Sequence, residues 1–107
     1  MIVLTDPLTL QHQSQVAALA LKYRLPSIYP NPELVDAGGL MAYGADLTYV
    51  LKRAAEYVDR ILRGAKPADL PIEETAHIAV VINLKTANAL GITIPESILL
   101  RADEVIR

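Results

Sequence analysis

The sequence predicts an α/β fold with three layers, in which helices cover a mostly parallel sheet built from βαβ units. Short apolar runs alternate with segments of helical periodicity along the 107 residues, and this alternation is typical of right-handed βαβ crossovers. One run, residues 78–82, is apolar throughout and rich in β-branched side chains. Such a run suits a strand that is covered on both faces. The length is that of a single domain over residues 1–107.

Two short strands flank the first expected helix. Four apolar residues fall at helical spacing after a polar first turn, namely Val16, Leu19, Ala20 and Tyr23. This helix is expected to end near Arg24, because Pro26 disfavours helical geometry at Leu25. The apolar run 2–4 and the short segment 27–29, each followed by a turn that contains proline, are the two expected strands.

The stretch 38–46 is expected to join a buried strand to the start of a helix. It follows a helical turn over residues 33–37, which the two glycines at 38 and 39 interrupt. Residues 40–42 form the expected strand, and Gly44 is expected to form the turn after it. Asp46 is then suited to cap the following helix with its carboxylate.

The clearest expected element is a helix from about Asp46 to Arg63. Seven apolar residues form one stripe along it: Leu47, Val50, Leu51, Ala54, Val58, Ile61 and Leu62. Gly64 is expected to end the helix as its C′ residue. On the polar side, two pairs of opposite charge are expected four residues apart, Glu56 with Arg60 and Asp59 with Arg63.

The remaining chain is expected to contain one more strand and one more clear helix. The expected elements are, in order, a loop at 67–71, extended chain at 72–75, a strand at 78–82, a helix at 84–90, a turn at 96–100 and a tail at 101–107. Asn83 is suited to cap the helix at 84–90, and Gly91 to end it.

Composition and charge argue against several classes of function. A formal net charge of −2 provides no field that would attract nucleic acid. Cysteine is absent, and His12 and His77 have no partners at metal-ligand spacing, so neither a metal nor a cofactor is expected. Nucleophile elbows and phosphate-binding glycine loops do not occur, which disfavours an enzyme. The chain has no apolar run as long as a membrane span, and its amino terminus lacks signal-peptide features.

Seven segments, taken in order and with their spacing, resemble one known family. They are VLTDPL at 3–8, RLPSIY at 24–29, GGLMAYGAD at 38–46, RAAEYVDRILRGAKPADLP at 53–71, VINLKTA at 81–87, LGITIP at 90–95 and RADEVI at 101–106. Together they resemble the substrate-binding proteins of tryptophan/tyrosine-type ABC transporters, which have a periplasmic-binding-protein type I fold. The resemblance covers nearly the whole chain.

This resemblance carries expectations about fold, partners and location. Such receptors have two lobes that close on a ligand by a hinge motion, and the chain resembles only about their last third. It is therefore expected to form part of one lobe of a truncated receptor. The resemblance implies a small, amino-acid-like ligand, an ABC permease as partner, and a periplasmic or membrane-anchored location outside the cytoplasmic membrane. Binding by the chain alone is expected to be weak or absent.

Five residues at strand ends and helix starts are the candidate ligand-binding residues, since open α/β folds bind ligands at the carboxyl ends of their strands. Asp6 could accept hydrogen bonds from an amino group, or merely form a local turn. Tyr43 offers an apolar ring with a hydroxyl, and Gly44 would allow close approach of a ligand to the backbone. Tyr29 is an outer candidate. Asp46 is more readily explained as a helix cap than as a ligand contact.

Two functions from different classes remain open. The first is the solute-binding component of an ABC transporter, or a piece of one, for an amino-acid-like molecule. The alternative is a self-associating structural or interaction fragment that does not bind a ligand independently. It would form a homo-oligomer through an exposed sheet edge or an uncovered apolar face.

Overall fold

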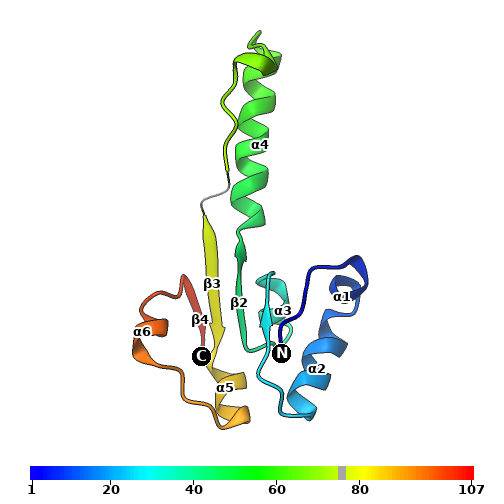
Figure 1. Cartoon of the computed structure of the whole chain (residues 1–107), viewed down its shortest axis with the longest axis vertical. Helices are drawn as coiled ribbons and strands as arrows, with labels where there is room; N and C mark the ends of the chain where they lie inside the picture. Colours follow the sequence, from blue (N-terminus) through cyan, green and yellow to red (C-terminus); the bar gives the residue numbers. More distant parts are fainter. Residues whose placement is uncertain (75–76) are drawn as a thin grey trace. The chain divides into compact units, whose positions relative to one another are not determined.

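A computed structural model describes residues 1–74 and 77–107 of the chain (Figure 1). The chain divides into two compact units. Unit 1 comprises Met1–Gly44 and Ala79–Arg107, and unit 2 comprises Ala45–Ile78. The prediction of one domain over 1–107 stays a prediction.

Four short strands form the sheet, and their order is β1-β2-β3-β4. They are β1 (Ile28–Tyr29), β2 (Met41–Ala45), β3 (Ile78–Asn83) and β4 (Glu104–Ile106). β1 pairs with β2 in parallel, and so does β3 with β4. β3 runs back beside β2 in the opposite direction (Figure 1), and the Asn83 amide donates to the Leu40 carbonyl over 2.8 Å. The α/β class and the mostly parallel sheet are therefore confirmed.

Five helices of unit 1 accompany this sheet. They are α1 (Pro7–Gln11), α2 (Gln13–Lys22), α3 (Glu33–Asp36), α5 (Leu84–Leu90) and α6 (Glu96–Leu99). The fully buried side chains of largest volume are Tyr29, Leu34, Val35 and Ile82. They come from β1, α3 and β3, so the core of unit 1 lies where α3 packs on the sheet. None of the helices in the described part of the chain is long and apolar enough to cross a membrane.

Several sequence predictions for unit 1 were wrong, and three of them concern its first and last segments. Residues 2–4 make only an isolated parallel bridge, between Ile2 and Ile28, instead of a strand. Helix α1 was missed, because Asp6 and Pro7 start a helix and do not form a simple turn. The tail contains β4, which pairs with β3. This pairing depends on a distant strand and could not be predicted from the local sequence. Asp103 strengthens this pairing, since its carboxylate accepts from the Val80 amide over 2.8 Å.

Asn83, the last residue of β3, forms hydrogen bonds with residues of α3 and α5. It caps α5 as predicted. Its Oδ1 accepts from the Thr86 amide over 3.1 Å, which caps α5. Its Nδ2 donates to the Val35 carbonyl over 3.3 Å, and the Thr86 hydroxyl donates to the Gly38 carbonyl over 2.9 Å. Asn83 is buried, so these bonds satisfy polar groups that water does not reach.

Unit 2 is built on α4 (Leu47–Leu62), whose two ends match the predictions. The Asp46 carboxylate caps its start by accepting from the Tyr49 amide over 3.2 Å. At its end Gly64 adopts a φ of 107°. The amides of Gly64 and Ala65 then donate to the carbonyls of Ile61 and Arg60 over 3.1 and 3.0 Å. This pattern is a Schellman motif, which satisfies the last carbonyls of the helix.

After α4 the chain turns through a 3₁₀ helix, η1 (Pro67–Asp69), and runs back beside the helix (Figure 1). We call residues 67–74 the strap. The Tyr57 hydroxyl donates to the Pro71 carbonyl over 2.7 Å. Residues 72–74 carry no regular secondary structure. The last residue of the expected extended segment, Thr75, lies outside the described residues.

The charges of α4 follow the sequence prediction only in part. Arg63 and Asp59 form the predicted ion pair at 3.0 Å. The prediction of a Glu56–Arg60 pair was wrong, because Glu56 pairs with Arg53. Arg53 also pairs with Glu73 of the strap, a residue distant in sequence. Glu73 therefore joins the strap to α4.

Candidate ligand-binding site

Three parallel chain segments of unit 1 lie side by side. Ile2 is paired with Ile28, and Ile28 with Met41. The residues just beyond the paired positions come together in a region that we call the unit 1 edge and define as Thr5, Asn31, Tyr43 and Gly44, the last two of which still belong to β2. The Thr5 hydroxyl donates to the Asn31 side-chain oxygen over 3.1 Å, which joins the first two segments there. Such an edge is where open α/β folds bind ligands.

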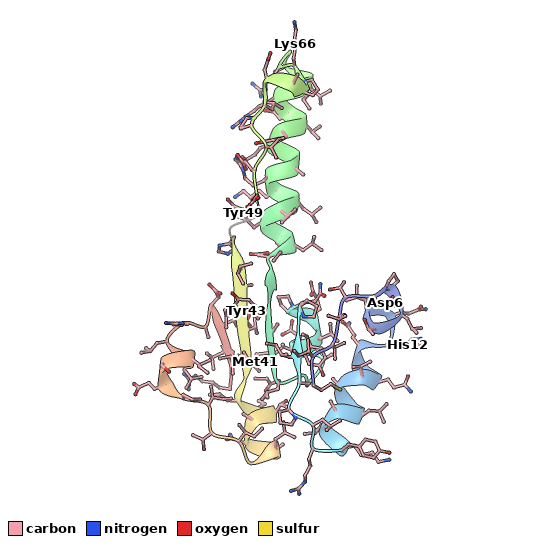
Figure 2. The ribbon with its side chains drawn as sticks, viewed as in Figure 1. Asp6, His12, Met41, Tyr43, Tyr49 and Lys66 are labelled. Carbon is pink, nitrogen blue, oxygen red and sulfur yellow. The ribbon has the colours of Figure 1, made fainter. Side chains whose placement is uncertain are left out.

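Asp6 follows Thr5 but has a structural role. Its Oδ1 accepts from the Leu8 amide over 2.8 Å, and its own amide donates to the Thr9 hydroxyl over 3.3 Å. This is a capping box at the start of α1. Figure 2 shows Asp6 beside α1 and Tyr43 on β2, so the two side chains do not converge. The carboxylate is exposed and can accept further hydrogen bonds. A ligand contact by Asp6 stays a prediction.

Tyr43 is the accessible aromatic group at the unit 1 edge, with 57% of its surface exposed. Gly44 does not form the predicted turn, since it lies within β2. A Cβ at Gly44 would lie 2.0 Å from the Pro30 carbonyl oxygen. The backbone of Pro30, and not a ligand, therefore occupies the space beside the Cα of Gly44. Direct ligand contact by either residue stays a prediction.

Tyr29 lies beneath this edge and is not accessible to solvent. Its relative exposure is 1%, and its ring packs so closely on Gly39 that a Cβ there would lie 2.4 Å from the ring. Its hydroxyl has no hydrogen-bond partner among the described residues. A direct role for Tyr29 in ligand contact stays a prediction, one that its burial does not favour.

Asp46 belongs to unit 2, whereas the other four candidates belong to unit 1. Besides capping α4, its Oδ2 lies 3.6 Å from Nε2 of His77. The His77 ring lies 5.2 Å from the Tyr49 ring, centroid to centroid. The expected role as a helix cap is confirmed, and a ligand contact by Asp46 stays a prediction.

Sequence reasoning missed a groove of about 410 Å³ between α4 and the strap. Its principal polar and aromatic lining residues are Tyr49, Arg53, Tyr57 and Glu73. The Arg53 guanidinium lies 5.7 Å from the centre of the Tyr57 ring and binds the Glu73 carboxylate. The sequence contained an indication of this groove, because Tyr49, Arg53 and Tyr57 are spaced four residues apart and so lie on one side of α4. Among the described residues, no cluster of ligating side chains suits a metal ion.

The ion pair in this groove predicts a pH dependence. Hydrogen bonds from Arg53 hold the pKa of Glu73 below its usual 4.5. A lowered pKa means that the charged carboxylate stabilises the folded arrangement above pH 4.5, and that this stabilisation is lost as the pH falls below it. We expect the strap to become mobile on acidification through this range, as measured by heteronuclear NOE of its amides.

Two variants serve as controls for this pH effect. Glu73→Gln should give a strap that is already mobile at neutral pH and changes little on acidification. Glu74→Gln, one residue away, should retain the transition. A strap whose mobility follows the same pH curve in wild type and in Glu73→Gln would contradict the assignment.

One family model matches the chain over nearly its whole length. It covers residues 1–106 and describes the ABC transporter substrate binding protein family. No match to the chain was found among curated proteins.

Three solved structures are similar to the chain. A conserved domain protein from Vibrio cholerae is 29% identical, with a TM-score of 0.84 over 97% of this chain. An ABC domain from Streptococcus pneumoniae, in complex with L-Trp, is 33% identical, with a TM-score of 0.81 over 94% of this chain. A ligand-free, open substrate-binding protein with adhesive properties from Clostridium difficile is 23% identical over 98% of this chain, and its TM-score of 0.69 shows the shared fold alone. The chain covers 35% of each of these proteins.

Proposed function

Because this chain belongs to the ABC transporter substrate-binding protein family, we propose that it forms part of a solute receptor that works with an ABC permease outside the cytoplasmic membrane. The family is one of substrate-binding proteins and not of enzymes. The chain covers 35% of the similar solved structures. It would therefore supply only part of a ligand cleft.

We further propose that the ligand is amino-acid-like and that the unit 1 edge binds it. The exposed Tyr43 ring carries this proposal, because it offers an apolar face and a hydroxyl just beyond the positions at which β1 pairs with β2. The Thr5 hydroxyl and the Asn31 side chain provide hydrogen-bonding groups at the same edge. The L-Trp in the complex of the Streptococcus pneumoniae protein supports this ligand class.

The proposal predicts that Tyr43→Ala weakens binding of L-tryptophan by about tenfold or more, the loss expected of an aromatic anchor. Because Tyr43 is exposed, the free energy of unfolding should change by less than about 0.5 kcal/mol. The measurement is a titration of the ¹⁵N-labelled chain with millimolar L-tryptophan, with chemical-shift changes expected at the amides of Thr5, Asn31, Tyr43 and Gly44.

Tyr23→Ala is the matched control for this titration. Tyr23 is 65% exposed and lies in unit 1, at the end of α2 and away from the edge. The control should bind as the wild type does. Shift changes scattered over both units, or equal losses in the two variants, would contradict the assignment of the site.

The alternative function, self-association without independent ligand binding, is favoured by one observation. No residue of α4 is buried, so the apolar stripe predicted from the sequence stays largely open to solvent. A surface of this kind is typical of an interaction site. The two functions are compatible, because the stripe and the unit 1 edge are different surfaces.

A further inference from the structure

A row of exposed apolar side chains runs along α4 beside the groove, and only one member of this row, Ala54, also lines the groove. We call this row the α4 stripe and define it as Leu47, Leu51, Ala54, Ala55, Val58 and Leu62. Its four large members are 53%, 61%, 55% and 81% exposed, in chain order. On a helix of 3.6 residues per turn these positions lie on one face. The face is centred away from Tyr49, Arg53 and Tyr57, which line the groove.

We propose that the α4 stripe binds the same stripe of a second copy of this chain, with the two helices antiparallel about a two-fold axis between Ala54 and Ala55. The intervals between successive members are 4, 3, 1, 3 and 4, so the stripe reads the same from both ends. A two-fold axis therefore sets Leu47 against Leu62, and Leu51 against Val58, of the other copy. A self-complementary patch is what such an axis requires.

The sizes of the side chains fit this arrangement. Ala54 and Ala55 occupy the centre, where small side chains allow two helices to approach closely. The larger leucine and valine side chains lie toward both ends, where each gains apolar contact with its counterpart. Pairing would remove from water the most exposed apolar surface of unit 2 that lies on a helix.

Charges beside the stripe favour the antiparallel orientation. Lys52 and Asp59 are seven residues apart, so they lie on the same side of the helix. In the antiparallel pair, Lys52 of one copy comes within about 3 Å along the axis of Asp59 of the other, from a rise of about 1.5 Å per residue. Two such pairs form by symmetry. Asp59 already pairs with Arg63 of its own chain, so Lys52 of the other copy would share this carboxylate with Arg63.

The sheet edges offer less to a second copy. Ile2 already pairs with the outer side of β1, and β4 is only three residues long and begins with the charged Glu104. Short and charged edges resist pairing. Of the two routes to self-association, an apolar face and a sheet edge, the structure therefore favours the apolar face.

Sedimentation velocity of the full chain over a range of concentrations tests the pairing. We expect a reversible monomer–dimer equilibrium, and Leu51→Glu should raise the dimer dissociation constant by at least about tenfold, which is 1.4 kcal/mol. Leu100→Glu is the matched control, because Leu100 is 80% exposed and lies in unit 1. Both positions are exposed, and circular dichroism checks that the variants fold. A wild-type monomer at every concentration, or equal effects of the two variants, would overturn the proposal.

The orientation is tested by mixing two charge variants. Lys52→Glu and Asp59→Lys each create like-charge contacts in their own antiparallel dimers, so each alone should dimerise several-fold more weakly than wild type. Their equimolar mixture restores both opposite-charge contacts and should form a heterodimer at least as tightly as wild type. Arg101→Glu mixed with Glu104→Lys carries the same net charges outside unit 2 and should show no such preference. A mixture no tighter than its separate components would overturn the antiparallel arrangement.

Discussion

Gly44→Ala is expected to lower the free energy of unfolding by about 3 kcal/mol, near the upper end of the cost of overpacking a folded interior. A Cβ at this position would lie 2.0 Å from the oxygen, 2.8 Å from the carbon and 3.1 Å from the Cα of Pro30. These are backbone atoms at the end of β1, so no side-chain rotation relieves the contact. The pairing of β1 with β2 would have to shift. Urea unfolding measures the loss.

Gly91→Ala is the control for this effect. Gly91 ends α5 in the left-handed region, with a φ of 71°, and no described atom from a distant part of the chain lies within 4 Å of a Cβ there. Alanine there costs only the conformational penalty of about 1–2 kcal/mol. If Gly44→Ala proved no more destabilising than Gly91→Ala, the close approach of Pro30 would not be a constraint on the fold.

Asn83→Ala should also be strongly destabilising, by about 2–4 kcal/mol. Loss of the cap on α5 contributes about 0.5–2 kcal/mol. The buried Val35 carbonyl loses the hydrogen bond from Nδ2, and an unsatisfied buried acceptor costs about 1–3 kcal/mol. Thermal and urea unfolding of the variant provide the measurement.

Asp46→Ala separates the loss of a helix cap from the loss of the hydrogen bond to the Val35 carbonyl, because it removes a cap alone. Asp46 also caps a helix through one hydrogen bond, to the Tyr49 amide, but it is partly exposed and holds no distant carbonyl. Its replacement should therefore cost about 0.5–1 kcal/mol, as an exposed cap does. Equal losses for the Asn83 and Asp46 variants would mean that the bond to Val35 adds nothing.

Elements whose boundaries depend on local chemistry could be predicted from the sequence. Helix α5 begins and ends where the cap Asn83 and the left-handed Gly91 indicated. Helix α4 follows Asp46 and closes at Gly64 for the same reasons. In each case, a side chain or a backbone conformation within a few residues decides the boundary.

Features that depend on distant partners could not be predicted in this way. The sequence around Gly44 suggested a turn, because nothing near it shows that the Pro30 backbone, from the segment after β1, requires a glycine there. The spacing of Glu56 and Arg60 suggested an ion pair between them. The Glu56 carboxylate instead pairs with Arg53, which also pairs with Glu73. The pattern of charges along a helix does not reveal a second segment packed against it.

In the candidate site, too, some features depend on local sequence and others on distant residues. Parallel pairing brings Tyr43 of β2 beside the segment that follows β1, and its role in ligand binding stays a prediction. The burial of Tyr29 was not predictable, because it depends on the approach of Gly39 from the segment after α3. The capping role of Asp46 was predictable, since it needs only the start of its own helix.

The path of the chain through the sheet also matters for evolution and engineering. The polypeptide leaves unit 1 after Gly44 and re-enters it at Ala79, on strands that are neighbours in the sheet order. The entropy of closing such an excursion rises only slowly with its length. Unit 2 can therefore be lengthened, shortened or exchanged by recombination with little penalty to the register of the sheet.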